Sequence, residues 1–193
     1  MKVTYIEKGD IFSLEGVRNF AHGCNCAGAM GKGIALQFRV KYPEMYKQYV
    51  KLCKSRQFIP GGVFDYCEDG THIYNLGTQR SWRTKAEPRY IRMSLRKMLE
   101  LASESQVTSI AMPAIGAGLG GLTWDSVKGI IEEIASEFSI DIVLFIAAWV
   151  LAIISRVKYK NIFSLVLIVI YGVFLVFSVL GIIILFAVLI GHF

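Results

Sequence analysis

Charged residues are missing from one end of the chain. The sequence of 193 residues contains 21 Lys and Arg and 15 Asp and Glu, yet none of them lies between Asn161 and Phe193. A charge-free apolar segment of this length is too long for an ordinary buried helix, so it predicts insertion into a membrane. The charged remainder has the balance of a globular domain and is long enough to bury a core.

Cysteine and histidine are scarce, with four and three residues. No secretory signal peptide precedes the cysteines, because the first twelve residues alternate like a strand. We therefore expect free thiols in a reducing compartment. Cys24 and Cys26 are separated by one residue instead of the two typical of metal sites, and neither His22 nor His72 completes a ligand set. We expect no metal site and no cofactor.

Positive charge is not gathered on one stretch of the globular part. Arg156, Lys158 and Lys160 supply half of the net charge of +6. The other basic residues are scattered among acids, which predicts no nucleic-acid partner. Arg80, Trp82 and Arg83 lie in a polar connection, where they could border a pocket or face solvent.

Apolar runs and amphipathic stretches alternate along the first 145 residues. The patterns predict one long helix, 34–54, with a kink at Pro43, and further helices at Tyr90–Ser103 and Trp124–Phe138. They predict strands at Val3–Ile6, Asn19–Cys24, Gly61–Tyr66, Thr71–Leu76, Val107–Met112 and Ile140–Phe145, with a tight turn at Glu68-Asp69-Gly70. Such alternation is typical of an α/β domain with helices on both faces of the sheet.

Two glycine-rich segments each connect a predicted strand to a predicted helix. The first is Asn25–Ala35 and the second is Pro113–Leu122. Glycine lets the backbone approach a ligand closely, and the N–H groups of a helix start favour an anion. Neither segment matches the dinucleotide fingerprint or the P-loop. Two such loops on one sheet predict a clamp around a diphosphate.

Specific motifs in these loops resemble those of the macro domain family, in the branch common in bacteria and phages. The matching segments are Gly9-Asp10-Ile11, His22–Cys26 followed by Met30–Ala35, Ile73–Leu76 and Ile115–Leu119, in the family's order. The resemblance covers residues 1–145. It implies a three-layer α/β/α sandwich with a mixed central sheet that binds ADP-ribose or a derivative.

The resemblance also implies a role for individual residues. Asp10 would accept the adenine amino group, the backbone of Ile11 would lie beside the ring, Phe145 would pack on it, and Asn25 would face the distal ribose. The diphosphate would pass between two sets of residues: Gly28, Gly31, Lys32, Gly33 and Ile34 on one side, and Gly116, Ala117, Gly118 and Leu119 on the other. Asp10 could instead cap a turn, and Phe145 could belong to the core.

Catalysis is left open by the sequence. Hydrolases that resemble this chain carry an acid after the first glycine run, or a lysine after the central strand with an acid in the second loop. Ala35, Gln79 and Gly120 stand at those places, and none of them can move a proton or form a sugar adduct as lysine does. Phosphatase chemistry on ADP-ribose 1″-phosphate could use His22 or Asn25 as catalytic residues.

The C-terminal part predicts a membrane anchor. We divide the chain into the macro domain at 1–145, a linker or interfacial segment at 146–161 and a transmembrane tail at 162–193. Residues 162–191 would extend about 45 Å as a helix, against a hydrocarbon core of about 30 Å. One crossing keeps the basic cluster and the domain on the cytoplasmic side, as the positive-inside rule prefers. A two-helix hairpin is the alternative if the sheet forgoes its last strand.

Three functions are therefore compatible with the sequence. The first is a membrane-tethered sensor or reader of ADP-ribose, with the lipid bilayer as partner and with homo-oligomerisation through the tail as an option. The second is an enzyme that acts on ADP-ribose 1″-phosphate or on protein-linked ADP-ribose. The third is an inert anchored scaffold.

Overall fold

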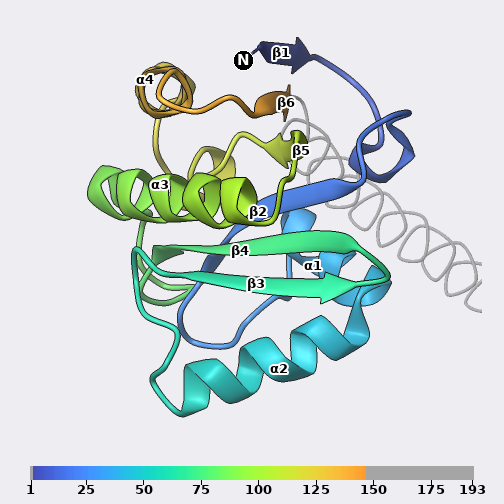
Figure 1. Cartoon of the computed structure of the whole chain (residues 1–193). Helices are drawn as coiled ribbons and strands as arrows, with labels where there is room; N and C mark the ends of the chain where they lie inside the picture. Colours follow the sequence, from blue (N-terminus) through green and yellow to red (C-terminus); the bar gives the residue numbers. More distant parts are fainter. Residues whose placement is uncertain (1, 147–193) are drawn as a thin grey trace, which may run out of the picture. The chain divides into compact units, whose positions relative to one another are not determined.

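The structure is a computed structural model that describes residues 2–146. Six strands form one sheet in the order β1-β6-β5-β2-β4-β3, which runs from top to bottom in Figure 1. Five strands are parallel and β3 alone is antiparallel to its neighbour β4. The bounds are β1 (Val3–Ile6), β2 (Asn19–Asn25), β3 (Val63–Glu68), β4 (Thr71–Gln79), β5 (Ser109–Pro113) and β6 (Asp141–Phe145). The predicted α/β fold with a mixed sheet is confirmed.

Helices cover both faces of this sheet. The α-helices are α1 (Gly33–Lys41), α2 (Pro43–Lys54), α3 (Pro88–Glu104) and α4 (Trp124–Ala135), and short 3-10 helices lie at η1 (Ile11–Ser13) and η2 (Gly118–Gly120). The neighbouring β4 residues Tyr74 and Ile73 belong to different core clusters. Tyr74 packs with α3 and α4, and Ile73 packs with α1 and α2. Successive strand side chains point to opposite faces, so this division gives the three layers.

The prediction of one kinked helix over 34–54 is wrong. Two helices replace it, because Tyr42 leaves helical geometry with φ −125° and ψ 73°, and Pro43 begins α2. Proline disfavours helical backbone in the residue before it and suits the first helical position. The predicted helix Trp124–Phe138 also ends early, at Ala135.

The strand bounds shift by a few residues. The predicted Gly61–Tyr66 strand lies at Val63–Glu68, and the predicted Thr71–Leu76 strand continues to Gln79. The predicted turn joins them at Asp69 and Gly70, both of which have positive φ. Glu68 pairs with Thr71 across this turn, as expected of a two-residue hairpin loop.

Strand β6 lies inside the sheet, paired with β1 on one side and β5 on the other. The alternative of a two-helix membrane hairpin required the sheet to forgo this last strand. The sheet contains it. Among residues 2–146, no helix combines the length and apolar character needed to cross a membrane. The predicted linker after Ile146 and the predicted tail at 162–193 lie outside the described residues.

Candidate functional site

The carboxyl ends of the five parallel strands lie along one edge of the sheet. Each of these strands leads into a residue or loop that the sequence analysis named as a candidate for the site. Strand β1 leads to Asp10, β6 ends at Phe145, β5 leads to the second glycine loop, β2 ends at Asn25 before the first glycine loop, and β4 ends at Gln79. Neighbouring strands lie about 4.8 Å apart, so this edge extends over about 19 Å. Open α/β sheets bind ligands beyond such ends, and this edge has room for an extended one.

Asp10 caps the first turn after β1. Its carboxylate accepts hydrogen bonds from the Phe12 N–H at 2.9 Å and the Ser13 hydroxyl at 3.0 Å. The residue is nevertheless exposed to solvent. A carboxylate has about four acceptor sites, so the capping role leaves capacity for a ligand donor. The cap and the predicted adenine contact are therefore compatible.

Phe145 lies against the turn that carries Asp10. A Cβ built on Gly9 would lie 3.1 Å from the Phe145 ring, which explains the glycine. Only 3% of Phe145 is exposed, and it belongs to the same core cluster as Ile11. The structure thus packs Phe145 and Ile11 together in the core beside the Asp10 turn, with Phe145 mostly covered by protein.

Asn25 holds the first glycine loop in shape. Its side-chain oxygen accepts hydrogen bonds from the N–H groups of Ala27 and Ala29, at 2.9 and 3.3 Å, and its amide donates to the Ala29 carbonyl at 2.6 Å. The Tyr49 hydroxyl donates to the Asn25 carbonyl at 2.5 Å. Asn25 is 5% exposed, so its observed role is to fix the loop beside the predicted ribose position.

The two glycine loops meet. Gly33 has φ +61°, and a Cβ built on it would lie 3.1 Å from Leu119 Cδ1 in the second loop. Leu119 is 61% exposed, so its side chain reaches from one loop to the other instead of entering the core. The contact brings the two predicted sides of the diphosphate clamp together.

The remaining predicted residues of the first loop lie at the same edge of the sheet. They offer backbone groups and one positively charged side chain, that of Lys32. Gly28 has φ +80°, and its carbonyl accepts a hydrogen bond from the Tyr46 hydroxyl at 3.3 Å. A Cβ built on Gly31 would have no neighbouring atom within 4 Å, so this position faces open space. Lys32 is exposed at the start of α1, where helix N–H groups add to its positive charge. Ile34 packs under the loop against the core.

The second loop is fixed from below by the connection between β4 and α3. Gly116 has φ +73°, which other residues rarely adopt, and a Cβ on it would lie 2.4 Å from Ile91 Cδ1 and displace that side chain. The Gly120 carbonyl accepts a hydrogen bond from the Ala86 N–H at 2.9 Å. Gly118 is exposed with φ +66°, and Ala117 precedes the short η2 turn. The loop geometry therefore depends on a distant segment of the chain.

His22 lies in the core. Its ring is fully buried, stacks on Phe38 with the centroids 4.2 Å apart, and places Nε2 2.9 Å from the Asn75 side-chain oxygen. Burial lowers the pKa of His22 to about 4, although the hydrogen bond with Asn75 acts in the opposite direction. The ring is neutral at physiological pH and screened from solvent, which favours a packing role over the proposed catalytic one.

Groups able to transfer protons are sparse at the predicted ribose end. Gln79 lies there beside Gly120, whose built Cβ would be 4.0 Å from the Gln79 amide oxygen. Burial raises the pKa of the Cys26 thiol to about 12, and the nearby Cys53 adds to that rise. Within residues 2–146, no three His, Cys, Asp or Glu side chains are placed to hold a metal ion.

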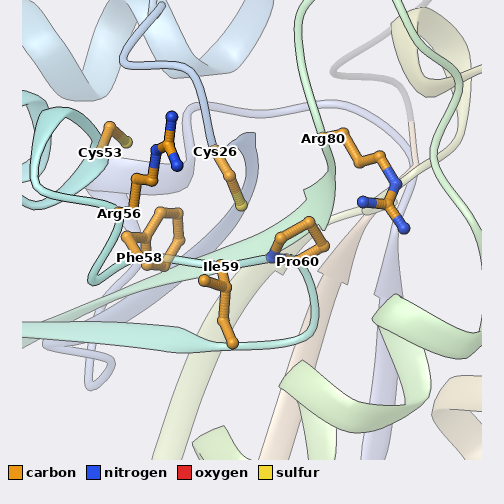
Figure 2. Close-up of a pocket in the computed structure, with 7 residues that line it drawn as sticks. All are labelled: Cys26, Cys53, Arg56, Phe58, Ile59, Pro60 and Arg80. Atoms are coloured by element: carbon orange, nitrogen blue, oxygen red, sulfur yellow. The ribbon is translucent and has the colours of Figure 1, made fainter.

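A hollow of about 380 Å³ adjoins this end of the edge and was not anticipated from the sequence (Figure 2). Its walls come from four separate places in the chain: Cys26, Cys53 with Arg56, Phe58–Pro60, and Arg80. Among these residues only Arg80 was considered as a pocket border. No local pattern marks the others, because they meet only when the end of α2 comes near the ends of β2 and β4.

Comparison with known proteins places these features in a family. A family model described as "Macro domain" matches residues 21–131. The DNA ADP-ribosyl glycohydrolase of Mycobacterium tuberculosis is 37% identical over 118 residues, which is 59% of this chain and 33% of that protein. The ADP-ribose glycohydrolase OARD1 of Homo sapiens is 32% identical over 146 residues, which is 75% of this chain and 91% of that protein.

Solved structures agree with the sequence comparison. The macrodomain of Mycobacterium tuberculosis DarG has a TM-score of 0.68 with 34% identity, and the alignment covers 74% of this chain and 96% of that one. Thermosipho africanus DarTG in complex with ADP-ribose has a TM-score of 0.66 with 26% identity, covering 75% of this chain and 41% of that one. The chain spans about a third of the length of the first curated relatives that it matches.

Proposed function

Because the chain belongs to the macro domain family, we propose that it binds ADP-ribose or a related NAD-derived nucleotide along the carboxyl edge of its sheet. The observation that carries this proposal is the contact between the two glycine loops at Gly33 and Leu119. Each loop joins a strand to a helix or a helical turn and contains positive-φ glycines, and the backbone N–H groups of such a start suit the charge of a diphosphate.

The ends of the ligand are assigned from the order of the strands. The adenine takes the β1 and β6 end, where Asp10 is exposed above Ile11 and Phe145. The distal ribose takes the β2 and β4 end, where Asn25 fixes the first loop and Gln79 ends the central strand. Lys32 adds a positive charge near the diphosphate.

We propose that the site is a sensor or reader rather than an enzyme. Gln79 and Gly120 lie together, and they occupy the two places where the family resemblance led us to look for a lysine and an acid. His22 is neutral and buried, and Cys26 stays protonated at physiological pH. None of these groups combines exposure with a pKa near neutrality, as general acid–base catalysis requires.

Hydrolysis of ADP-ribose conjugates is the second candidate. It is favoured by identities of 37% and 32% to proteins described as DNA ADP-ribosyl glycohydrolase and ADP-ribose glycohydrolase. A relative described as ADP-ribose 1″-phosphate phosphatase, from Meyerozyma guilliermondii, makes phosphate removal a variant of this candidate. Asn25 would then position the distal ribose for attack by water.

We further propose that residues 162–193 tether the domain to the cytoplasmic face of a membrane. The support is the absence of charge from this segment and the cluster of Arg156, Lys158 and Lys160 before it. Alkaline carbonate extraction should leave the full chain in the membrane pellet, and protease added to intact cells should spare the domain. Recovery of the full chain in the carbonate supernatant would contradict the tether.

Binding and turnover are tested together on the purified full chain in detergent. Calorimetry with ADP-ribose should give saturable one-to-one binding. Chromatography after incubation with ADP-ribose 1″-phosphate and with ADP-ribosylated DNA or protein should show no product. Product that disappears in Asn25→Ala would establish the enzymatic candidate, and absence of ADP-ribose binding would refute both.

A further inference from the structure

An exposed tryptophan lies in the connection between β4 and α3. Trp82 is 61% exposed, and among residues 2–146 it is the only Phe, Tyr or Trp that is exposed rather than buried or half-buried. Tryptophan has a large apolar ring and one polar N–H, so it is enriched where an apolar surface meets water. Its exposure makes this connection a candidate contact surface.

The turn that carries Trp82 is closed by its own hydrogen bonds. The Ser81 N–H donates to the Thr84 hydroxyl at 3.1 Å, and the Thr84 N–H and hydroxyl both donate to the Ser81 carbonyl, at 3.1 and 3.0 Å. The Arg83 N–H donates to the Ser81 hydroxyl at 3.2 Å. Trp82 and Arg83 therefore occupy the two central positions of a formed turn.

Positive charge surrounds the tryptophan. Cζ of the Arg83 guanidinium lies 4.6 Å from the centre of the Trp82 ring. The nearest acid in the sequence is Glu87, which lies 3.9 Å from Nε of one arginine of the turn but accepts a 2.8 Å hydrogen bond from Arg89. Residues 80–85, named the basic turn from here on, contain three exposed cations and no acid: Arg80, Arg83 and Lys85.

The two edges of the sheet differ in charge. At the carboxyl edge, the connections 26–32 and 114–123 add one lysine and no acid to the basic turn. The acids Glu7 and Asp10 follow β1 at that edge, four strand spacings from β4, or about 19 Å. At the opposite edge, the turn between β3 and β4 carries Glu68 and Asp69. A negatively charged plane would therefore attract the β4 end of the carboxyl edge and repel the turn at the other edge.

The described part of the chain ends at the same edge. Ile146, the last described residue, follows β6 at its carboxyl end, and three strand spacings, or about 14 Å, separate β6 from β4. Residues 147–161 precede the proposed tail, and a chain of that length reaches at most about 50 Å. A tether attached at this edge therefore keeps the basic turn near the surface of the bilayer.

We propose that the basic turn docks on an anionic membrane surface, with Trp82 at the level of the headgroups and the three cations among acidic lipids. The docking rests on the proposed tether and adds an orientation to it, with the β4 end of the ligand edge turned toward the bilayer. Tryptophan concentrates at membrane–water interfaces. Each nearby Lys or Arg strengthens contact with an acidic leaflet by about fivefold.

A lipid surface fits the basic turn better than a nucleic acid does. Proteins that bind single strands place several aromatic side chains along a basic groove, so that successive bases stack. Trp82 is the only exposed aromatic side chain in the described part of the chain. One aromatic tip with three cations beside it instead suits a flat interface with an apolar layer beneath a charged one.

The test uses the full chain in nanodiscs of phosphatidylcholine, with or without phosphatidylserine, that carry a nitroxide quencher just below the headgroups. Trp124→Phe with Trp149→Phe leaves Trp82 as the single tryptophan of the three. The control reporter adds Ser105→Trp to a chain in which all three tryptophans are Phe. Ser105 is exposed after α3, at the opposite edge of the sheet. Co-elution with the discs tests the tether, and thermal melting checks that each variant folds.

In discs with phosphatidylserine, Trp82 should be quenched at least about twofold more than the Ser105→Trp reporter, because only the basic turn meets the headgroups. The difference should shrink in discs without phosphatidylserine and at high salt, which screens surface charge. Arg83→Gln with Lys85→Gln should abolish it. Lys41→Gln with Lys47→Gln removes two exposed cations outside the basic turn and should leave it unchanged.

The possible failures are distinguishable. Equal quenching of the two reporters, or Trp82 quenching that survives loss of phosphatidylserine and of both cations, would overturn the docking and leave the tether intact. A change in Trp82 emission with a thymidine oligonucleotide but not with phosphatidylserine would overturn it in favour of nucleic acid. A chain that does not co-elute with the discs would overturn the tether and the docking together.

Discussion

Gly33 and Leu119 come from different loops, and a Cβ on Gly33 would lie 3.1 Å from the Leu119 side chain. The loops follow β2 and β5, which are far apart in sequence but adjacent in the sheet. The contact closes one side of the proposed diphosphate site. It depends on a glycine whose φ of +61° other residues adopt only at a cost.

Gly33→Ala should weaken ADP-ribose binding about tenfold. The added methyl group strains the left-handed backbone by about 1–2 kcal/mol and pushes the Leu119 side chain away from the first loop. Calorimetry measures the change. Adding Leu119→Ala should restore part of the affinity by removing the clash, because the two positions are coupled. Gly129→Ala, in α4 with open space around it, should bind as wild type.

Asn25→Ala should lower both stability and ADP-ribose affinity. The substitution removes three hydrogen bonds within the first loop, at a cost of about 1–3 kcal/mol in unfolding free energy. Denaturant unfolding and calorimetry measure the two effects.

Asn19→Ala is the matched control, since Asn19 lies at the opposite end of the same strand and accepts a hydrogen bond from His72 N–H at 3.0 Å. It should lose stability without losing ADP-ribose affinity. Equal loss of affinity in both variants would mean that Asn25 acts only through general stability.

The stability of the domain should fall in mild acid through His22. The folded-state pKa of about 4 lies below the 6.5 of an ordinary histidine, so the unfolded chain takes up the proton first as pH falls. The stability that the neutral His22 ring gives the folded domain is fully present above about pH 6.5. It is lost as the pH falls toward 4, which lowers the free energy of unfolding by about 3 kcal/mol. Urea unfolding across this range should show a steeper pH dependence for wild type than for His22→Gln. Parallel curves would contradict the burial of a neutral ring.

Gln79→Lys should introduce ADP-ribosyl hydrolysis into a chain that, by our proposal, binds without turnover. The side chain ends the central strand beside Gly120, and a lysine amine there could form an imine with C1″ of the distal ribose. Borohydride should trap a covalent adduct, visible by mass spectrometry, in Gln79→Lys. The control Gln48→Lys, on exposed α2, should show none. An adduct or turnover in wild type would contradict the reader proposal.

The features that the sequence predicts correctly are those set by short stretches of chain. Alternation locates the strands, and the Asp69-Gly70 turn follows from residues that tolerate positive φ. The break at Tyr42 was predicted only as a kink, because helical periodicity continues through Pro43 while the backbone geometry does not.

Contacts between separate elements could not be predicted in the same way. The meeting of Gly33 with Leu119 and the use of the Asn25 amide within its own loop depend on which strands are neighbours and how tightly each loop turns. The placement of Arg56 and Arg80 around one hollow depends on the end of α2 lying near the end of β4. No spacing in the sequence encodes these distances.

The most direct measurement is a calorimetric titration of the full chain with ADP-ribose, ADP and AMP. An extended site along the carboxyl edge should bind one ADP-ribose per chain, with affinity falling in the order ADP-ribose, ADP, AMP as contacts to the distal ribose and then the second phosphate are removed. Gly33→Ala should weaken ADP-ribose and ADP more than AMP. No saturable binding of ADP-ribose, or equal affinity for all three nucleotides, would contradict a site that spans both glycine loops.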